Sequence, residues 1–192
     1  MKKLLILGPL PGQGHAGGIE TQIALLVPEF QRRGWAVSTV ETFHQPWSLG
    51  LLWHALREGI TSDAVLIMGL GVKSLVLSIL TRRPTVVSHH THISNTHKLR
   101  LLRWLSKTVK VNLFNSAFMQ ARLACALGSQ KPSTVYPCYD DSTFSAANAA
   151  FNNHAQGAKG RDSYDFGFVG RLIPDKGLEI FLAALRELSS PK

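Results

Sequence analysis

The chain has 192 residues, 45% of them hydrophobic and 17% charged, a balance typical of a globular protein rather than a disordered one. No apolar run approaches the ~20 residues that a membrane-spanning helix needs. The run Leu4–Leu7 is too short for the apolar core of a signal peptide. We therefore expect a cytoplasmic protein. The formal net charge of +9 is uneven, because residues 97–136 hold seven basic and no acidic side chains. This concentration suggests an anionic partner at one surface.

Short aliphatic runs alternate with helical stretches along the first three quarters of the chain. The predicted strands are Lys3–Gly8, Ala36–Glu41, Ala64–Met68, Thr85–His89, Val109–Phe114 and Ser133–Tyr136. The predicted helices are Gly18–Arg33, Leu49–Glu58, Val72–Thr81, Thr96–Lys107 and Ser116–Leu127. Nearly continuous apolar strands are expected in a parallel sheet buried on both faces. The alternation predicts an α/β fold with a doubly wound, Rossmann-like parallel sheet, whose ligands bind at the carboxyl ends of the strands.

The composition changes after Phe144. Residues 145–163 are small and polar, which is typical of a linker or a mobile loop. The pattern then restarts with a predicted strand, Tyr164–Val169, and a predicted helix, Leu178–Leu188. We therefore expect a first domain over residues 1–144, a linker over 145–163 and the start of a second domain over 164–192. One βα unit cannot bury a core of its own, so we expect that most of the second domain is missing.

The loop after the first strand is rich in glycine. It holds a formal dinucleotide-binding fingerprint, G-x-G-x-x-G with an acidic residue after the second strand, at Gly12, Gly14, Gly17 and Glu41. Two prolines lengthen the turn that this fingerprint needs to be tight, so an NAD(P)-binding protein is a remote alternative. Gly17 and Gly18 open a predicted helix, where they let a phosphate or a sugar hydroxyl approach free backbone N–H groups. A flexible loop with no ligand remains the other alternative.

Four of the eight histidines follow or end the fourth predicted strand: His89, His90, His92 and His97. A metal site is one interpretation. However, no carboxylate or cysteine lies nearby in the sequence, and strand alternation sends His89 and His90 to opposite faces. We therefore expect no metal and favour a hydrogen-bonding histidine that faces a ligand cleft.

The predicted helix Thr96–Lys107 is strongly basic. Its candidate contact residues are Lys98, Arg100, Arg103 and Trp104. The spacing of four predicts that Leu101, Leu105 and Val109 form its core-facing side. The basic side is either an ordinary solvated surface or a site for an acceptor or for anionic lipid headgroups at the inner face of a membrane. Nucleic acid is not expected, because no interleaved stacking aromatics are present.

Arg171 and Lys176 stand between the last predicted strand and the last predicted helix. Two cations beside a helix N-terminus suit a diphosphate. In sugar transfer from a nucleoside diphosphate, fixed cations stabilise the negative charge that develops on the leaving group.

These motifs, in this order, resemble those of glycosyltransferase family 4, which are retaining enzymes of the GT-B fold. The matching segments are Gly17–Glu20 (GGxE), Val86–His90, Asn115–Phe118 (NSxF), Val135–Phe144 at the domain junction and Phe168–Gly177 (GRL…KG). The junction has Cys138 where the family has glycine or proline. Glu179 and Glu187 match the spacing of the family's paired glutamates, but they come several elements too early, so we treat this match as a coincidence.

The resemblance implies transfer of a hexose, with retention, from a UDP- or GDP-sugar to a glycan or lipid-linked acceptor. His90 would be the catalytic-site histidine, beside the transferred sugar. Gly17 and Gly18 would lie near the donor, and Arg171 and Lys176 would hold its diphosphate, with neither metal nor cofactor. Because the donor domain is cut short, we expect little turnover by this chain alone. A non-catalytic acceptor- or membrane-binding module that needs a separate donor-binding chain is the alternative.

Overall fold

The computed structural model describes residues 1–10, 17–90, 96–127, 132–135 and 178–189. The chain divides into two compact units, Met1–Asp141 and Ser142–Lys192. The strands described in the first unit are β1 (Lys2–Gly8), β2 (Trp35–Glu41), β3 (Ala64–Met68), β4 (Thr85–His89), β5 (Val111–Phe114) and β6 (Pro132–Thr134). Its described helices are α1 (Gly18–Arg32), α2 (Leu49–Thr61), α3 (Val72–Thr81), α4 (Thr96–Leu105), the 3-10 helix η1 (Ser106–Thr108) and α5 (Ala117–Leu127). In the second unit the described residues form the helix α7 (Leu178–Ser189). None of the described helices is long and apolar enough to cross a bilayer.

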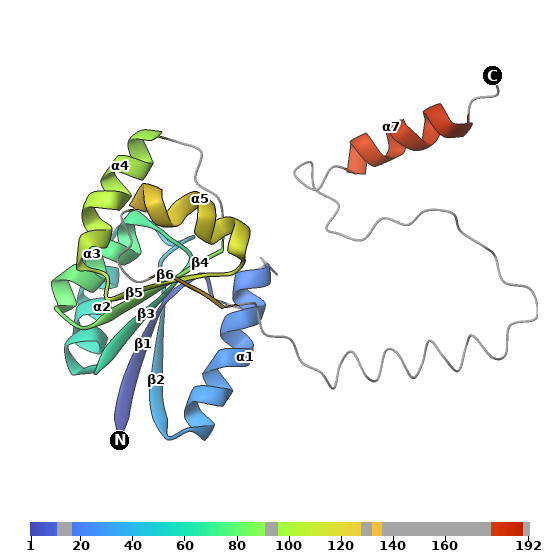
Figure 1. Ribbon diagram of the computed structural model, residues 1–192. Coiled ribbons are helices and arrows are strands. Elements are labelled where there is room, and N and C mark those ends of the chain that lie inside the picture. Colours follow the sequence, from blue (N-terminus) through green and yellow to red (C-terminus); the bar gives the residue numbers. More distant parts are fainter. Residues whose placement is uncertain (11–16, 91–95, 128–131, 136–177, 190–192) are drawn as a thin grey trace, which may run out of the picture. The chain divides into compact units, whose positions relative to one another are not determined.

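The strands of the first unit form one parallel sheet in the order β2-β1-β3-β4-β5-β6 (Figure 1). From β1 the chain moves outward to β2 on one side and then crosses to β3 on the other, which is the reversal that defines a doubly wound sheet. In the strand register Gly8 pairs with Glu41, Met68 with Ser88, and His89 with Phe114. The C-terminal ends of the strands therefore meet along one edge, which we call the carboxyl edge.

Helices cover the two faces of the sheet unequally. Helices α2, α3, α4 and α5 pack on one face, where the core includes Leu5, Leu7, Ile67 and Phe114. On the other face α1 is the helix among the described elements, and it packs on Leu4, Ile6, Leu66 and Met68. Alternate residues of β1 thus enter different cores, which explains why the strand reads as a continuous apolar run. The two helical layers are visible on opposite sides of the sheet in Figure 1.

Most helix ends follow from local sequence. Ser48 caps α2, because its side chain accepts a hydrogen bond from Leu51 N–H at 3.0 Å. Ser116 Oγ accepts from Met119 N–H at 3.2 Å and caps α5 as predicted. After α1, Gly34 adopts a positive φ of 82° and its N–H donates to the carbonyl of Gln31. This left-handed conformation favours glycine and stops the helix.

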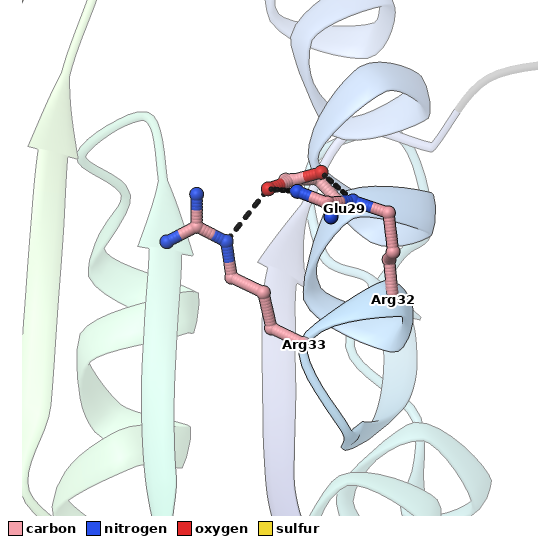
Figure 2. Close-up of polar contacts among 3 residues, drawn as sticks. All are labelled: Glu29, Arg32 and Arg33. Carbon is pink, nitrogen blue, oxygen red and sulfur yellow. Dashed lines mark hydrogen bonds and ion pairs between the residues drawn. The ribbon is translucent and has the colours of Figure 1, made fainter.

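The C-terminal turn of α1 carries a compact ion cluster, drawn in Figure 2. Arg32 forms two hydrogen bonds of 2.8 Å with the carboxylate of Glu29, and Arg33 Nε donates to the same carboxylate at 2.6 Å. The bonds from Arg32 and, to a smaller extent, from Arg33 lower the pKa of Glu29 to about 2. The cluster is exposed to solvent, so it contributes little to stability.

Two predictions for α4 and its surroundings were wrong. Leu101 does not face the core but is 45% exposed, whereas Leu102 is fully buried with Leu105. The predicted core residues Leu105 and Val109 do pack in the core, so the prediction fails at Leu101 alone, whose place Leu102 takes. The helix also ends at Leu105, and η1 follows where the prediction continued the helix. Ser106 and Thr108 cause this change, since their hydroxyls donate to the carbonyls of Arg103 and Leu105, three residues earlier. As a result β5 begins at Val111 instead of Val109.

Candidate functional site

The candidate site lies at the carboxyl edge of the sheet. Backbone hydrogen bonds continue across the strands one residue beyond this edge. Thr42 N–H donates to the carbonyl of Gly8, Gly69 N–H to that of Ser88, and Asn115 N–H to that of His89. The first residues after β2, β3 and β5 are thus each bonded to the end of a neighbouring strand. The predicted site residues Gly17, Gly18 and His90, and Asn115 of the NSxF motif, follow strands that end at this edge.

Among the described residues, no side chain caps the first turn of α1. Gly17 is the N-cap residue, and the N–H groups of the first turn have no intrahelical partners. A methyl group added to Gly18 would meet no atom within 4 Å. At Gly17 it would lie 2.4 Å from Glu20 Oε2, because the buried side chain of Glu20 folds back over the turn. Gly18 therefore offers an open approach to the positive end of the helix.

His90 lies just after β4 and is half-buried on the α1 side of the sheet. Its Nε2 is 2.9 Å from Ser88 Oγ, and its backbone carbonyl accepts a bond of 3.4 Å from the side-chain amide of Asn115. His90 and Ser88 line an apolar cavity of about 320 Å³, together with Val86, Leu113 and residues of α1. Burial lowers the pKa of His90, because an apolar surrounding disfavours the charged ring. At neutral pH this ring is uncharged and has one donor nitrogen and one acceptor nitrogen.

His89 points to the opposite face, as strand alternation predicted. Its Nε2 is 2.8 Å from Asn112 Oδ1, and its ring stacks on Phe114 with centroids 4.6 Å apart. Burial lowers the pKa of His89, the hydrogen bond that its Nε2–H donates to Asn112 Oδ1 opposes this shift, and the electrostatic interaction with His90 adds to it. In the described part of the chain, His89 Nδ1 and Asn115 Oδ1 are buried without a hydrogen-bond partner. The two adjacent histidines face away from each other, so they cannot be ligands of one ion.

Glu41 has a structural role that the sequence did not indicate. It is buried at the end of β2, where its carboxylate accepts from the backbone N–H groups of Leu10 and Phe43, both at 2.6 Å, and of His44 at 3.1 Å. In a dinucleotide-binding protein the acidic residue at this place binds the ribose. Here both carboxylate oxygens already hold the loops after β1 and β2 together. This arrangement disfavours the NAD(P) alternative.

The predicted contact residues of α4 that the structure describes with their side chains are exposed. Arg100 and Arg103 are exposed, and Trp104 exposes 65% of its surface. The backbone of Lys98 belongs to α4, but its side chain lies outside the described part of the structure. The predicted acceptor or membrane contacts thus remain available for a partner.

Several predicted site residues lie outside the described residues: Gly12, Gly14, His92, Cys138, Arg171 and Lys176. The predicted strand Tyr164–Val169 also lies outside them. Cys125 is a free cysteine on an exposed face of α5. Within the described ranges, no three histidine, cysteine, aspartate or glutamate side chains gather as an ion site would require.

Ser88 and Glu20 were noted from the sequence as parts of motifs, but their supporting roles were not predicted. Ser88 precedes His90 by two positions, and Glu20 follows Gly17 by three. The strand period of two and the helical first turn give both spacings, so the signal was present. Asn115 was noted as part of a motif, but its bonds to the backbone around His90 depend on the pairing of β4 with β5 and have no local signature.

No protein-family model matches the chain, and no curated protein matches it either. Its fold is similar to that of the Anabaena protein HepE, solved in complex with UDP-glucose, with a TM-score of 0.64 and 20% identity over 97% of this chain. It is also similar to an alpha-glucosyltransferase in complex with UDP and a 13-mer DNA, with a TM-score of 0.51 and 12% identity over 77% of this chain. A complex of alpha-glucosyltransferase with UDP gives a TM-score of 0.50 and 12% identity over 73% of this chain.

The chain spans 58% of the length of HepE and 44% and 45% of the two alpha-glucosyltransferase chains. At these identities the likeness establishes the fold. The prediction of an α/β, doubly wound, Rossmann-like sheet, as in the N-terminal half of a GT-B protein, is confirmed.

Proposed function

We propose that the chain belongs to a nucleotide-sugar glycosyltransferase and forms the acceptor-side half of its site. The observation that carries the proposal is that an open helix N-terminus at Gly17–Gly18 and the half-buried His90 both follow strands that end at one carboxyl edge. The fold is shared with a protein solved with UDP-glucose and with an alpha-glucosyltransferase solved with UDP, which supports this reading. Membership of glycosyltransferase family 4, and hence transfer with retention, rests on the order of the sequence motifs.

The proposed roles follow from the groups that each residue presents. The N–H groups of the first turn of α1 donate to the diphosphate or to a sugar hydroxyl. When Ser88 Oγ–H donates to Nε2 of His90, the neutral ring carries its proton on Nδ1 and can donate to a hydroxyl oxygen of the transferred hexose or of the acceptor. The motif resemblance assigns to Arg171 and Lys176 the binding of the diphosphate as its charge develops. The proposal needs neither a metal nor a cofactor.

The acceptor that we propose is a glycan or a lipid-linked sugar. The exposed Arg100, Arg103 and Trp104 of α4, with Lys98, are candidate contacts for such an acceptor or for anionic lipid. One of the similar alpha-glucosyltransferase structures contains DNA, so duplex DNA is the necessary negative test. A mobility shift of duplex DNA by this chain at physiological salt would contradict our choice of acceptor class.

The proposal is tested by titrating UDP-glucose into isotopically labelled chain and following its amide and histidine ring signals by NMR. We expect the signals of Gly17, Gly18 and His90 to shift, and His90→Ala to weaken binding by about tenfold, the equivalent of one hydrogen bond of ~1.4 kcal/mol. His54→Ala, at an exposed histidine of α2, is the matched control and should bind like wild type. Binding of NADH at this edge without any binding of UDP-glucose would refute the proposal.

A further inference from the structure

A group of large apolar side chains is exposed between β2 and the first turns of α2. Phe43 is 42% exposed, Trp47 54%, Leu49 86% and Trp53 72%. We call these four residues the β2–α2 patch. Residues 43–50 between them are all exposed. Soluble proteins seldom expose large apolar side chains in such a group, and where they do the surface commonly binds a partner.

The β2–α2 patch lies at the carboxyl edge, because it follows the end of β2. Phe43 also reaches over the end of β3, where a methyl group added to Gly69 would lie 2.9 Å from its Cζ. Gly69 N–H donates to the carbonyl of Ser88 at 2.9 Å, and Ser88 Oγ is bonded to His90. A short series of contacts therefore links the patch to the candidate site.

The charges along the patch itself are cationic, and the acids that flank it, Glu41 and Glu58, are both hydrogen-bonded and not fully exposed. Lys73 Nζ lies 6.0 Å from the centroid of the Trp47 ring and donates to the carbonyl of Gln45. Residues 42–57 contain no aspartate or glutamate and end with Arg57. The nearest preceding acid, Glu41, is buried with its oxygens bonded to backbone N–H groups. Tryptophan and leucine side chains beside cations, with no exposed acid between them, match the interface of an anionic bilayer.

We propose that the β2–α2 patch docks on an anionic membrane surface, with Leu49, Trp47 and Trp53 in the headgroup region and Lys73 against the lipid phosphates. Docking through this patch brings the carboxyl edge close to the lipid. If the proposed glycosyltransferase function holds, on which this last step rests, the acceptor class narrows to a lipid-linked sugar. The surface differs from the basic side of α4, so the two can be tested separately.

The experiment is co-sedimentation of the full 192-residue chain with vesicles of phosphatidylcholine, with and without phosphatidylglycerol. We expect binding to the mixed vesicles, weakened by salt, and a drop of at least tenfold in the partition coefficient for the double variant Leu49→Ser/Trp53→Ser. The matched control is Ile60→Ser, which removes an exposed apolar side chain from the other end of α2. Leu49, Trp53 and Ile60 are all exposed, so thermal melting should show that each variant folds.

A second measurement follows tryptophan quenching by brominated lipid in a Trp104→Phe chain, which removes the signal of α4. Quenching that is lost in Leu49→Ser/Trp53→Ser supports the proposal. Wild-type-like binding by that variant overturns it, and so does loss of binding in Arg100→Ala/Arg103→Ala alone. A change in tryptophan fluorescence on addition of a soluble oligosaccharide, without binding to vesicles, would mean that the patch binds sugar and would also overturn the proposal. None of these assays needs a nucleotide sugar, so their failure is distinct from a failure to bind UDP-glucose.

Discussion

Replacing Gly18 by alanine separates the functional explanation of the glycine pair from a purely structural one. Gly18 is the first residue of α1, does not have a positive φ, and has open space where the methyl group would lie. Alanine restricts the unfolded chain and favours the helix, so Gly18→Ala should stabilise the first unit by roughly 0.5–1 kcal/mol. For a chain of this size the melting temperature should rise by about 1–4 °C. A ligand that approaches the backbone at Gly18 should nevertheless bind less well, by about tenfold.

The neighbouring substitution Gly17→Ala should instead destabilise the first unit. The added methyl group would lie 2.4 Å from Glu20 Oε2, so the carboxylate must turn away from the helix N-terminus. Losing a carboxylate at this end costs about 0.3–1 kcal/mol, and alanine is a poorer N-cap than glycine. The clash itself should disappear in the background of Glu20→Ala. A double-mutant cycle over Gly17 and Glu20 therefore has a non-zero coupling energy, whereas the same cycle over Gly18 and Glu20 has none.

Urea unfolding followed by circular dichroism measures both stabilities, and NMR titration with UDP-glucose measures the affinity of each variant. The informative result is the combination in Gly18→Ala of higher stability and weaker binding, because misfolding cannot produce it. If Gly18→Ala is more stable and binds UDP-glucose like wild type, no ligand approaches this backbone, and the proposed role of Gly17–Gly18 is wrong.

Three further substitutions test residues that support the sheet and the loops around the site. The stability of the chain should fall as the pH drops below 6.5, the ordinary pKa of histidine, because the unfolded state takes up the proton that buried His89 resists; the slope per group is at most ~1.4 kcal/mol per pH unit. His89→Gln should flatten this dependence in urea titrations at several pH values, and an unchanged slope would exclude His89 as its source. Gly59→Ala should destabilise α2 by about 1–3 kcal/mol, since the new methyl group would lie 2.1 Å from Thr81 Cγ2; adding Thr81→Ser should restore stability, and a failure to do so would place the strain elsewhere. Glu41→Gln should cost about 1.5–3 kcal/mol in thermal or urea unfolding, while wild-type stability would show that its backbone bonds contribute little.

The sequence predicted the fold well where the chain alternates between unambiguous elements. The limits of β3, β4 and α3 agree with the prediction, because each is bounded by glycine, proline or a polar residue. The region from Leu101 to Val109 was harder. Several apolar residues there give two helical faces of similar width, and packing against α3 and α5 decides that Leu102 is buried. The hydroxyl bonds that end α4 early compete with helix propensity over a single turn, where pattern reasoning is least reliable.

The candidate site was predictable as far as strand geometry goes. The opposite orientations of His89 and His90 follow from the period of two, and the place of Gly17–Gly18 follows from the helix start. The engagement of Glu41 could not be predicted, since it depends on backbone donors from loops after two strands that are neighbours only in the folded sheet. The same holds for Asn112, which meets His89 because β4 and β5 pair in one particular register.

The backbone bonds beyond the carboxyl edge bear on how this half-site works. Each of the loops after β2, β3 and β5 begins with an N–H group bonded to a neighbouring strand, at Thr42, Gly69 and Asn115. The strand end that precedes His90 and the first residue of the loop after β2 are thus held by the sheet, so binding there need not pay to order these backbone groups. In contrast, no side chain of the described residues caps the first turn of α1. An anionic substrate should therefore interact first with the N–H groups of this turn, and UDP-glucose should perturb the amide signals of α1 more strongly than those of β4.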